Sequence, residues 1–135
     1  MQFGADALLR EYKTMGLEGL VVQASPHERI RMLLDGCLER IATAKAQLER
    51  SDQAGKGQSI SKALAILDGL RSALDADRGG EVAANLESLY EYCSRRLLEA
   101  SAGNDPAVMS EVETLLTQIR DAWIAIGDAP HGHAA

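Results

Sequence analysis

The sequence predicts an all-α fold, an antiparallel up-down four-helix bundle with a short N-terminal cap segment. Four stretches carry apolar residues at spacings of three, four or seven, which is the period of one helical face. Short polar segments separate these stretches, and short connections favour antiparallel neighbours. No stretch alternates apolar and polar residues for long, as a half-buried strand would. We therefore expect helices only.

The first bundle helix is expected to begin at Pro26 and to extend to about Arg50. The run SPHE that opens it is typical of a capping box, in which Ser25 accepts from a first-turn amide and Glu28 reaches back. The segment SDQAGKG then breaks the helical pattern. The apolar stripe of this helix, widened by Leu33 and Leu38, consists of Ile30, Leu34, Cys37, Ile41 and Leu48.

The second and third helices are separated by the segment DADRGG. Two adjacent glycines lower helical preference, so the second helix should end there and the third should start at Glu81 and end in ASAGN. The stripe of the second helix is Ile60, Leu64, Leu67, Leu70 and Leu74. The stripe of the third helix is Val82, Leu86, Leu89, Cys93, Leu97 and Ala100.

The fourth helix repeats the combination of a capping residue and a proline, at Asp105 and Pro106. Gly127 is the expected C-terminal stop. Its stripe has an unbroken spacing of four and three: Val108, Val112, Leu115, Ile119, Ala122 and Ile126. The bundle is thus expected to occupy residues 25–127.

The two ends of the chain differ from the bundle. Residues 1–24 contain one short amphipathic stretch followed by an apolar stretch that two glycines interrupt. This segment is either an end cap on the bundle or a removable lid over a binding groove, and the residues leave both open. Residues 128–135 are expected to form a disordered tail.

Composition and charge narrow the class of partner. The 135 residues fit one domain, and 46% apolar with 25% charged residues is ordinary globular usage. A net charge of -6 gives no long-range attraction to nucleic acid or to anionic membranes. Neither a signal sequence nor a membrane-spanning stretch is recognisable, so we expect a cytoplasmic protein without membrane insertion.

The sequence offers no candidate catalytic site, and neither an enzymatic activity nor a cofactor is expected. A metal pair in a helical bundle needs inward Glu-x-x-His motifs, which do not occur. A phosphorelay domain needs a histidine in mid-helix, whereas His27 lies in a capping box and His131 and His133 lie in the tail. Cys37 and Cys93 are on apolar stripes, where buried reduced thiols are expected.

A binding module is the remaining class, because helical grooves can hold a partner helix. Off the narrowest core stripes lie Leu33, Leu38, Ala65 and Leu89, each of which is also compatible with a place in the core. Asp35 and Asn85 are polar residues inside apolar stretches, and their side chains must find hydrogen-bond partners. Each could contact a partner protein or bridge two helices.

Several runs resemble the FliS family of flagellar export chaperones in order, spacing and loop length. The similarity covers residues 23 to 126. Its specific parts are the GGE-x-A-x-NL-xx-LY-x-Y pattern, the RRL-xx-A pattern and the closing E-xx-LL-xx-I-R-x-AW pattern.

The resemblance implies both a fold and a function. Members of that family form an antiparallel four-helix bundle with an N-terminal cap, and they bind the C-terminal part of flagellin in the cytoplasm, which prevents premature polymerisation. Asp35, Asn85 and Tyr90 match motif positions of a client-binding surface, and Leu34 stands where an aromatic residue is common. The counterparts of the aromatic residues in the family's N-terminal lid are Phe3 and Tyr12.

A second function stays open beside the first. A helical adaptor or regulatory protein could have the same bundle and bind another flagellar partner, such as an anti-sigma factor or a component of the export gate. Either protein could be a monomer or a homodimer when free.

Overall fold

The computed structural model describes residues 24–74 and 76–127, with the side chains of residues 76–78 left out. The predicted N-terminal cap, with Phe3 and Tyr12, and the predicted tail lie outside the described residues. The described helices are α3 (Pro26–Glu49), α4 (Gln53–Ser72), α5 (Ala76–Gly103) and α6 (Pro106–Ile126).

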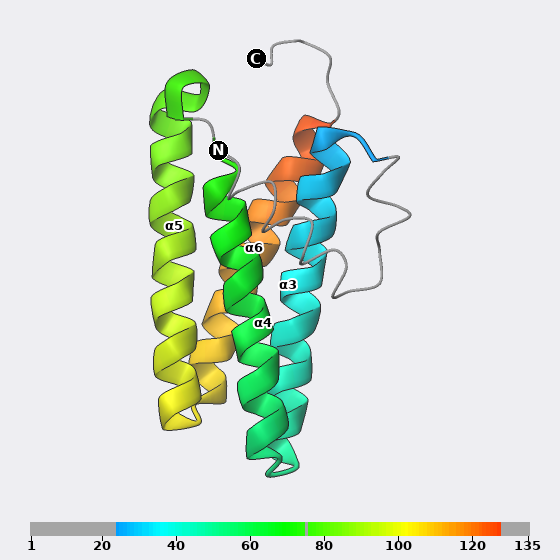
Figure 1. The fold of residues 1–135 in the computed structure, drawn as a ribbon, viewed down its shortest axis with the longest axis vertical. Coiled ribbons are helices and arrows are strands. Elements are labelled where there is room, and N and C mark those ends of the chain that lie inside the picture. Colours follow the sequence, from blue (N-terminus) through cyan, green and yellow to red (C-terminus); the bar gives the residue numbers. More distant parts are fainter. Residues whose placement is uncertain (1–23, 75, 128–135) are drawn as a thin grey trace.

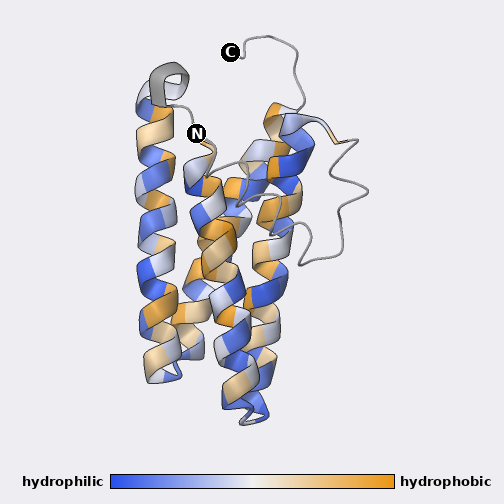
Figure 2. Cartoon of the chain, viewed as in Figure 1, coloured by the Kyte–Doolittle hydropathy of each residue, from blue (hydrophilic) through white to orange (hydrophobic). Residues whose placement is uncertain are grey.

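Consecutive helices are antiparallel, and each one packs against two others (Figure 1). α3 contacts α4 and α6, and α5 also contacts α4 and α6. Polar and apolar residues alternate around each helix, as expected when one face of a helix is buried (Figure 2). The prediction of an all-α, up-down four-helix bundle is confirmed.

The helix starts follow the predicted capping chemistry with one difference. The Ser25 hydroxyl accepts from the Glu28 amide at 3.1 Å, and Asp105 caps α6 by accepting from the amides of Ala107 and Val108. The Glu28 carboxylate does not complete the capping box, because it accepts from the Arg31 guanidinium instead, at 2.8 Å from Nε. The nearby cation is the stronger partner for a carboxylate.

α4 begins earlier than predicted, inside the segment that was expected to be a break. Asp52 caps it by accepting from the Gly55 amide at 3.0 Å. The next residue, Lys56, is only 5% exposed, and its ammonium donates to the Ser101 carbonyl and the Asn104 side-chain oxygen at the end of α5, both at 2.7 Å. A contact with another helix therefore holds this glycine-containing turn in helical form.

The predicted break at the glycine pair is a kink. Gly80 has φ 54° and ψ −124°, a conformation that favours glycine, and it separates a first turn of α5 from the part that starts at Glu81. The predicted end of α6 is confirmed, because Gly127 has φ 74° at the C-cap. The long part of α5 thus begins where the sequence predicted.

Both cysteines are fully buried, as predicted. Desolvation raises the pKa of the Cys93 thiol to about 11, and the Cys37 thiol donates to the Ala63 carbonyl at 3.7 Å. A thiol with such a pKa is a poor nucleophile near neutral pH.

The predicted core stripes are correct for α3 and α4 and partly wrong for α5 and α6. Fully or almost fully buried residues form one cluster between the helices: Leu33, Leu34, Cys37, Ile41, Ala44, Ile60, Ala63, Ile66, Leu67, Leu70, Tyr90, Cys93, Leu97, Ala100, Met109, Val112 and Leu116. Four residues that were expected to be in the core are exposed, namely Val82, Leu89, Ala122 and Ile126. The arrangement of α5 and α6 explains this difference.

Candidate functional site

α5 and α6 are joined near their connecting loop by a polar cluster. The Glu111 carboxylate on α6 accepts from the Tyr92 hydroxyl at 2.6 Å and from Arg96 Nε at 3.0 Å, both on α5. These hydrogen bonds, first that of Tyr92, lower the pKa of Glu111, so the carboxylate stays charged at neutral pH. The contacts also identify which flanks of the two helices face each other.

Away from this cluster the two helices diverge (Figure 1). Val82, Leu89 and Arg96 recur at intervals of seven, so all three lie on the α6-facing flank of α5. Val82 is 66% exposed and Leu89 is 37% exposed, because α6 no longer covers this flank.

The flank of α6 that faces α5 is uncovered in the same way. Ala122 lies three helical turns beyond Glu111 on the same flank and is exposed, and Ile126 in the next turn is 63% exposed. We define the apolar strip as the four exposed residues of these facing flanks, Val82, Leu89, Ala122 and Ile126. The residues of the strip are spaced like those of a core stripe, but no helix covers them.

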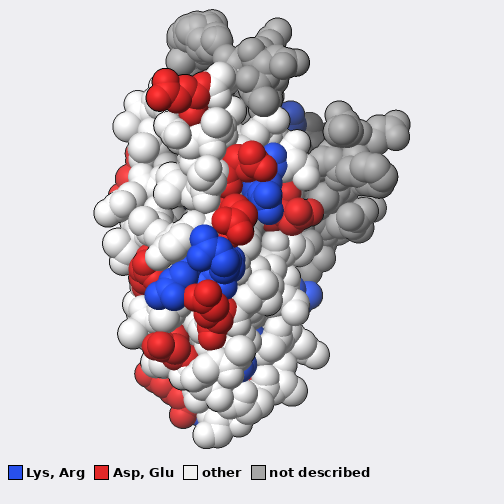
Figure 3. Space-filling model, turned by 90° about the vertical axis from the view of Figure 1, so that its left-hand side faces the viewer, with Lys and Arg blue, Asp and Glu red and all other residues white. Residues whose placement is uncertain are grey.

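Part of the molecular surface on the α5 side of the bundle carries no charged side chains. Figure 3 shows this side of the bundle, where acidic and basic side chains form a band across the middle. On the left, an area without charged side chains lies between this band and an acidic group near the top. Residues of α5 form ion pairs with α4 and within the helix, Arg71–Glu87 at 3.3 Å and Arg95–Glu91 at 3.5 Å. The centres of protein interfaces are depleted of charged side chains, and this area fits that condition.

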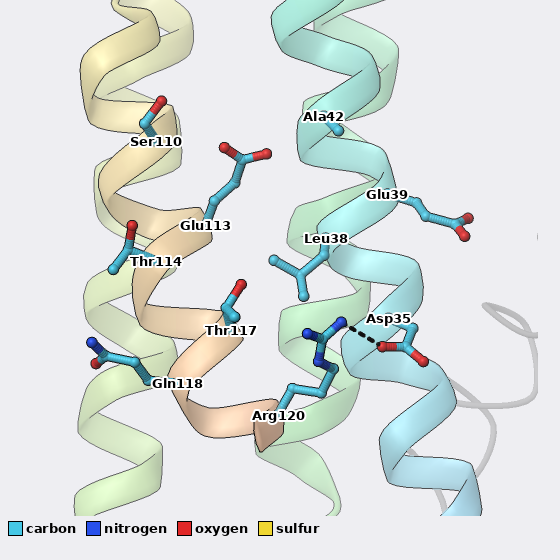
Figure 4. A pocket seen from close by; sticks show the side chains of 10 residues that line it. All are labelled: Asp35, Leu38, Glu39, Ala42, Ser110, Glu113, Thr114, Thr117, Gln118 and Arg120. Carbon is cyan, nitrogen blue, oxygen red and sulfur yellow. Dashed lines mark hydrogen bonds and ion pairs between the residues drawn. The ribbon is translucent and has the colours of Figure 1, made fainter. Parts of the chain in front are cut away.

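A second surface feature is an open groove of about 800 Å³ between α3 and α6 (Figure 4). Leu38 points into it from α3 and Thr117 from α6. Two ion pairs cross between the helices along it, Arg120–Asp35 at 3.2 Å and Lys45–Glu113 at 2.7 Å. The residues that line the groove are Asp35, Leu38, Glu39, Ala42, Ser110, Glu113, Thr114, Thr117, Gln118 and Arg120.

An aromatic contact joins α3 and α6 beyond the end of this groove. The His27 and Trp123 rings are stacked with centroids 4.7 Å apart and planes 9° apart. The Trp123 indole donates to the His27 carbonyl at 2.9 Å, and His27 Nε2 donates to the Trp123 carbonyl at 2.8 Å. The end of α6 is therefore held to the start of α3, while its opposite flank stays exposed.

The predicted binding residues do not form one continuous site. Leu33, Leu34 and Tyr90 are in the core. Asp35 and Leu38 line the α3–α6 groove. Asn85 and Leu89 are exposed on α5, and Ala65 is half-buried on α4. The predicted residues thus form two separate pairs, Asp35 with Leu38 on α3 and Asn85 with Leu89 on α5, and each pair lies within about one helical turn.

Sequence reasoning missed most of the strip and the α6 side of the groove. Val82, Ala122 and Ile126 were assigned to the core because their spacing is that of a core stripe. A usable signal was present, since Arg96 follows Val82 and Leu89 at the same interval of seven and a charged residue marks a flank. The groove residues of α6 gave no such signal, because hydroxyl and amide side chains are common on any exposed helical face.

Within residues 24–74 and 76–127, no group of three or more potential ligands among His, Cys, Asp and Glu is placed to hold a metal ion. His131 and His133 lie outside the described residues. In the same ranges, none of the helices combines the length and the hydropathy of a membrane span.

Comparison with known proteins identifies the family. The model of the family described as flagellar protein FliS matches residues 8–130. The flagellar secretion chaperone FliSB of Pseudomonas aeruginosa is 43% identical over 118 residues, which are 87% of this chain and 94% of the relative. The flagellar secretion chaperone FliS of Salmonella typhimurium is 44% identical over 116 residues, 85% of this chain and 86% of the relative.

A more distant relative has the same description. The flagellar secretion chaperone FliS of Bacillus subtilis is 37% identical over 100 residues, which are 74% of each protein. The match of the family model and the long alignments with these relatives show that the chain belongs to the FliS family of flagellar proteins.

Proposed function

We propose that this protein is a cytoplasmic flagellar secretion chaperone, which binds the C-terminal region of flagellin and prevents its polymerisation before export. The observation that carries the proposal is the apolar strip on the diverging flanks of α5 and α6. The relatives named above are described as flagellar secretion chaperones, and the sequence motifs point to the same role.

The strip has the chemistry that an amphipathic helix of a client requires. Its residues recur at helical spacing on two flanks that face each other, so a client helix could lie along them with its apolar face inward. Val82 and Ile126 are each more than half exposed. Covering a large aliphatic side chain completely contributes about 1.5–3 kcal/mol, so a few such contacts offset the ordering of a disordered segment.

This mode of binding explains how the protein would prevent assembly by contact alone. A flagellin segment whose apolar face lies on the strip is unavailable to a second flagellin molecule. The effect is stoichiometric, since no bond is made or broken. The protein therefore acts only while it is bound, and it must release flagellin at export.

Polymerisation of purified flagellin monomers tests the proposal. Light scattering after seeding should show that filament growth falls in proportion to the added protein and stops at about one molecule per flagellin. Leu98→Asp serves as a control variant, because Leu98 is 57% exposed on another flank of α5, and it should suppress growth equally well. Normal growth at an excess of the protein would favour the adaptor function, with an anti-sigma factor or an export-gate component as partner.

A further inference from the structure

The first turns of α5 are loosely packed against the rest of the bundle. We define the α5 arm as residues 81–89, which lie between the kink at Gly80 and the buried Tyr90. Within the arm Ala83 is buried and Leu86 is half-buried, and all other residues are exposed. Each turn of α5 after the arm, in contrast, contributes a residue to the core. A segment with so few buried apolar contacts can move at a low cost in free energy.

An exposed ion pair ties the α5 arm to α4. Arg71 Nη2 lies 3.3 Å from a Glu87 carboxylate oxygen, and the two side chains are 34% and 58% exposed. Such a pair contributes little, because water screens the charges. Gly80, with φ 54°, separates the arm from the turn that follows α4. A small rotation at this glycine would therefore tilt the arm without moving that turn.

The helix that faces the arm is held at both ends. Near the connecting loop, Glu111 binds α6 to the second half of α5 through Tyr92 and Arg96. At the other end, the stacked and hydrogen-bonded pair of His27 and Trp123 binds α6 to α3. Of the two diverging segments, the α5 arm is thus the one that can move.

The register of α5 and α6 places the residues of the strip opposite one another. Glu111 is level with position 94, midway between its two donors on α5. Val82 lies twelve residues before position 94, so it is level with position 123, twelve residues after Glu111. Along the axis of α6, Val82 therefore falls between Ala122 and Ile126.

We propose that the α5 arm alternates between the open arrangement described above and a closed one, in which it tilts onto α6 and Val82 packs between Ala122 and Ile126. Closure exchanges a weak ion pair for apolar contact, since Val82 is 66% exposed and Ile126 is 63% exposed when the arm is open. The arm then covers the apolar strip with residues of the same chain.

The consequence of closure for flagellin rests on the proposed function. A closed molecule cannot offer the strip to a client, so the apparent affinity falls by the fraction of molecules that are open. The α5 arm thus acts as an intramolecular competitor, and a client that binds the strip holds the arm open.

Disulfide formation between the arm and α6 tests the closed arrangement. Val82→Cys with Ala122→Cys should form an intramolecular disulfide about tenfold faster than Val82→Cys with Ile124→Cys, since the bond needs closely opposed Cβ atoms. Ile124 is a matched control, because it is also exposed but lies on another flank of α6. The native Cys37 and Cys93 are fully buried and do not compete. Equal rates for the two variants would overturn the closure.

Removing the ion pair tests the same movement without changing the strip. Glu87→Gln should speed formation of the disulfide between positions 82 and 122 about threefold, because the arm is no longer tied to α4. Glu91→Gln is the matched control, since Glu91 pairs with Arg95 inside α5, at 3.5 Å, and the net charge changes equally. If Glu87→Gln formed the disulfide no faster than Glu91→Gln, release of the arm from α4 would not be the movement that closes it.

The cross-linked protein connects the closure to the proposed function. Titration calorimetry with the C-terminal flagellin segment should show at least about tenfold weaker binding to the disulfide form than to the reduced form of the same variant. Equal binding by both forms would contradict an inhibitory role of the arm. Failure of the reduced variant and the wild-type protein alike to bind the segment would instead overturn the proposed function itself.

Discussion

Replacing Trp123 with alanine is expected to lower the free energy of unfolding by about 3 kcal/mol. The stacked His27–Trp123 pair, at 4.7 Å, contributes about 0.5–1.5 kcal/mol beyond area burial. The lost indole hydrogen bond to the His27 carbonyl, at 2.9 Å, is worth about 0.5–1.5 kcal/mol. The remainder comes from the apolar contact that the half-buried indole makes with the core.

Urea denaturation followed by circular dichroism measures this effect, since the substitution removes the only tryptophan. Trp123→Phe should cost about 1 kcal/mol, because it keeps an aromatic ring and loses the hydrogen bond. Ile124→Ala, at the exposed neighbouring residue, should change stability by less than about 0.5 kcal/mol. A loss for Trp123→Ala no greater than that for Ile124→Ala would show that this contact does not hold α6 to α3.

The double substitution Val82→Asp with Leu89→Asp is expected to weaken binding of the flagellin segment at least about a hundredfold. Each carboxylate removes an apolar contact and must lose water if the client covers it. A loss of about 1.4 kcal/mol at each of two positions multiplies to about a hundredfold in affinity. Val82 is 66% exposed, so its substitution should change stability little, whereas Leu89 is only 37% exposed and its substitution should cost about 1 kcal/mol. Circular dichroism verifies that the double variant folds.

Leu98→Asp is the matched control for this pair. It introduces the same carboxylate at a leucine that is 57% exposed on α5, but nine residues from Leu89 and therefore on the opposite side of the helix. Binding by this variant should equal that of the wild-type protein. If the double variant also bound as tightly as the wild type, the strip would not be the client surface.

The helix ends could be predicted from sequence where local chemistry decides them. Ser25 and Asp105 each precede a proline and cap a helix through their own side chains, so the contacts lie within a few residues. Gly80 and Gly127 adopt positive φ, which glycine does readily because it has no side chain, so these breaks are also decided locally. The start of α4 was missed because Lys56 is fixed by Ser101 and Asn104, far away in sequence, which local propensity does not contain.

The candidate site was predictable only in part, because a core stripe and a docking strip have the same spacing. Val82 and Cys93 both fit the α5 stripe, yet Val82 is 66% exposed and Cys93 is buried. The angle between α5 and α6 decides which of these two residues is covered. That angle depends on the packing of the whole bundle and cannot be deduced from local spacing. Asp35 was singled out as a polar residue in an apolar stretch, but its bond to Arg120 links residues 85 positions apart.

Titration calorimetry of this protein with the C-terminal segment of the flagellin from its own organism tests the central claim most directly. The account predicts saturable binding with one site per protein, a negative heat-capacity change from burial of the apolar strip, and a gain of helix by circular dichroism. No heat of binding at tens of micromolar protein, in conditions where the bundle is folded, would contradict flagellin as the client.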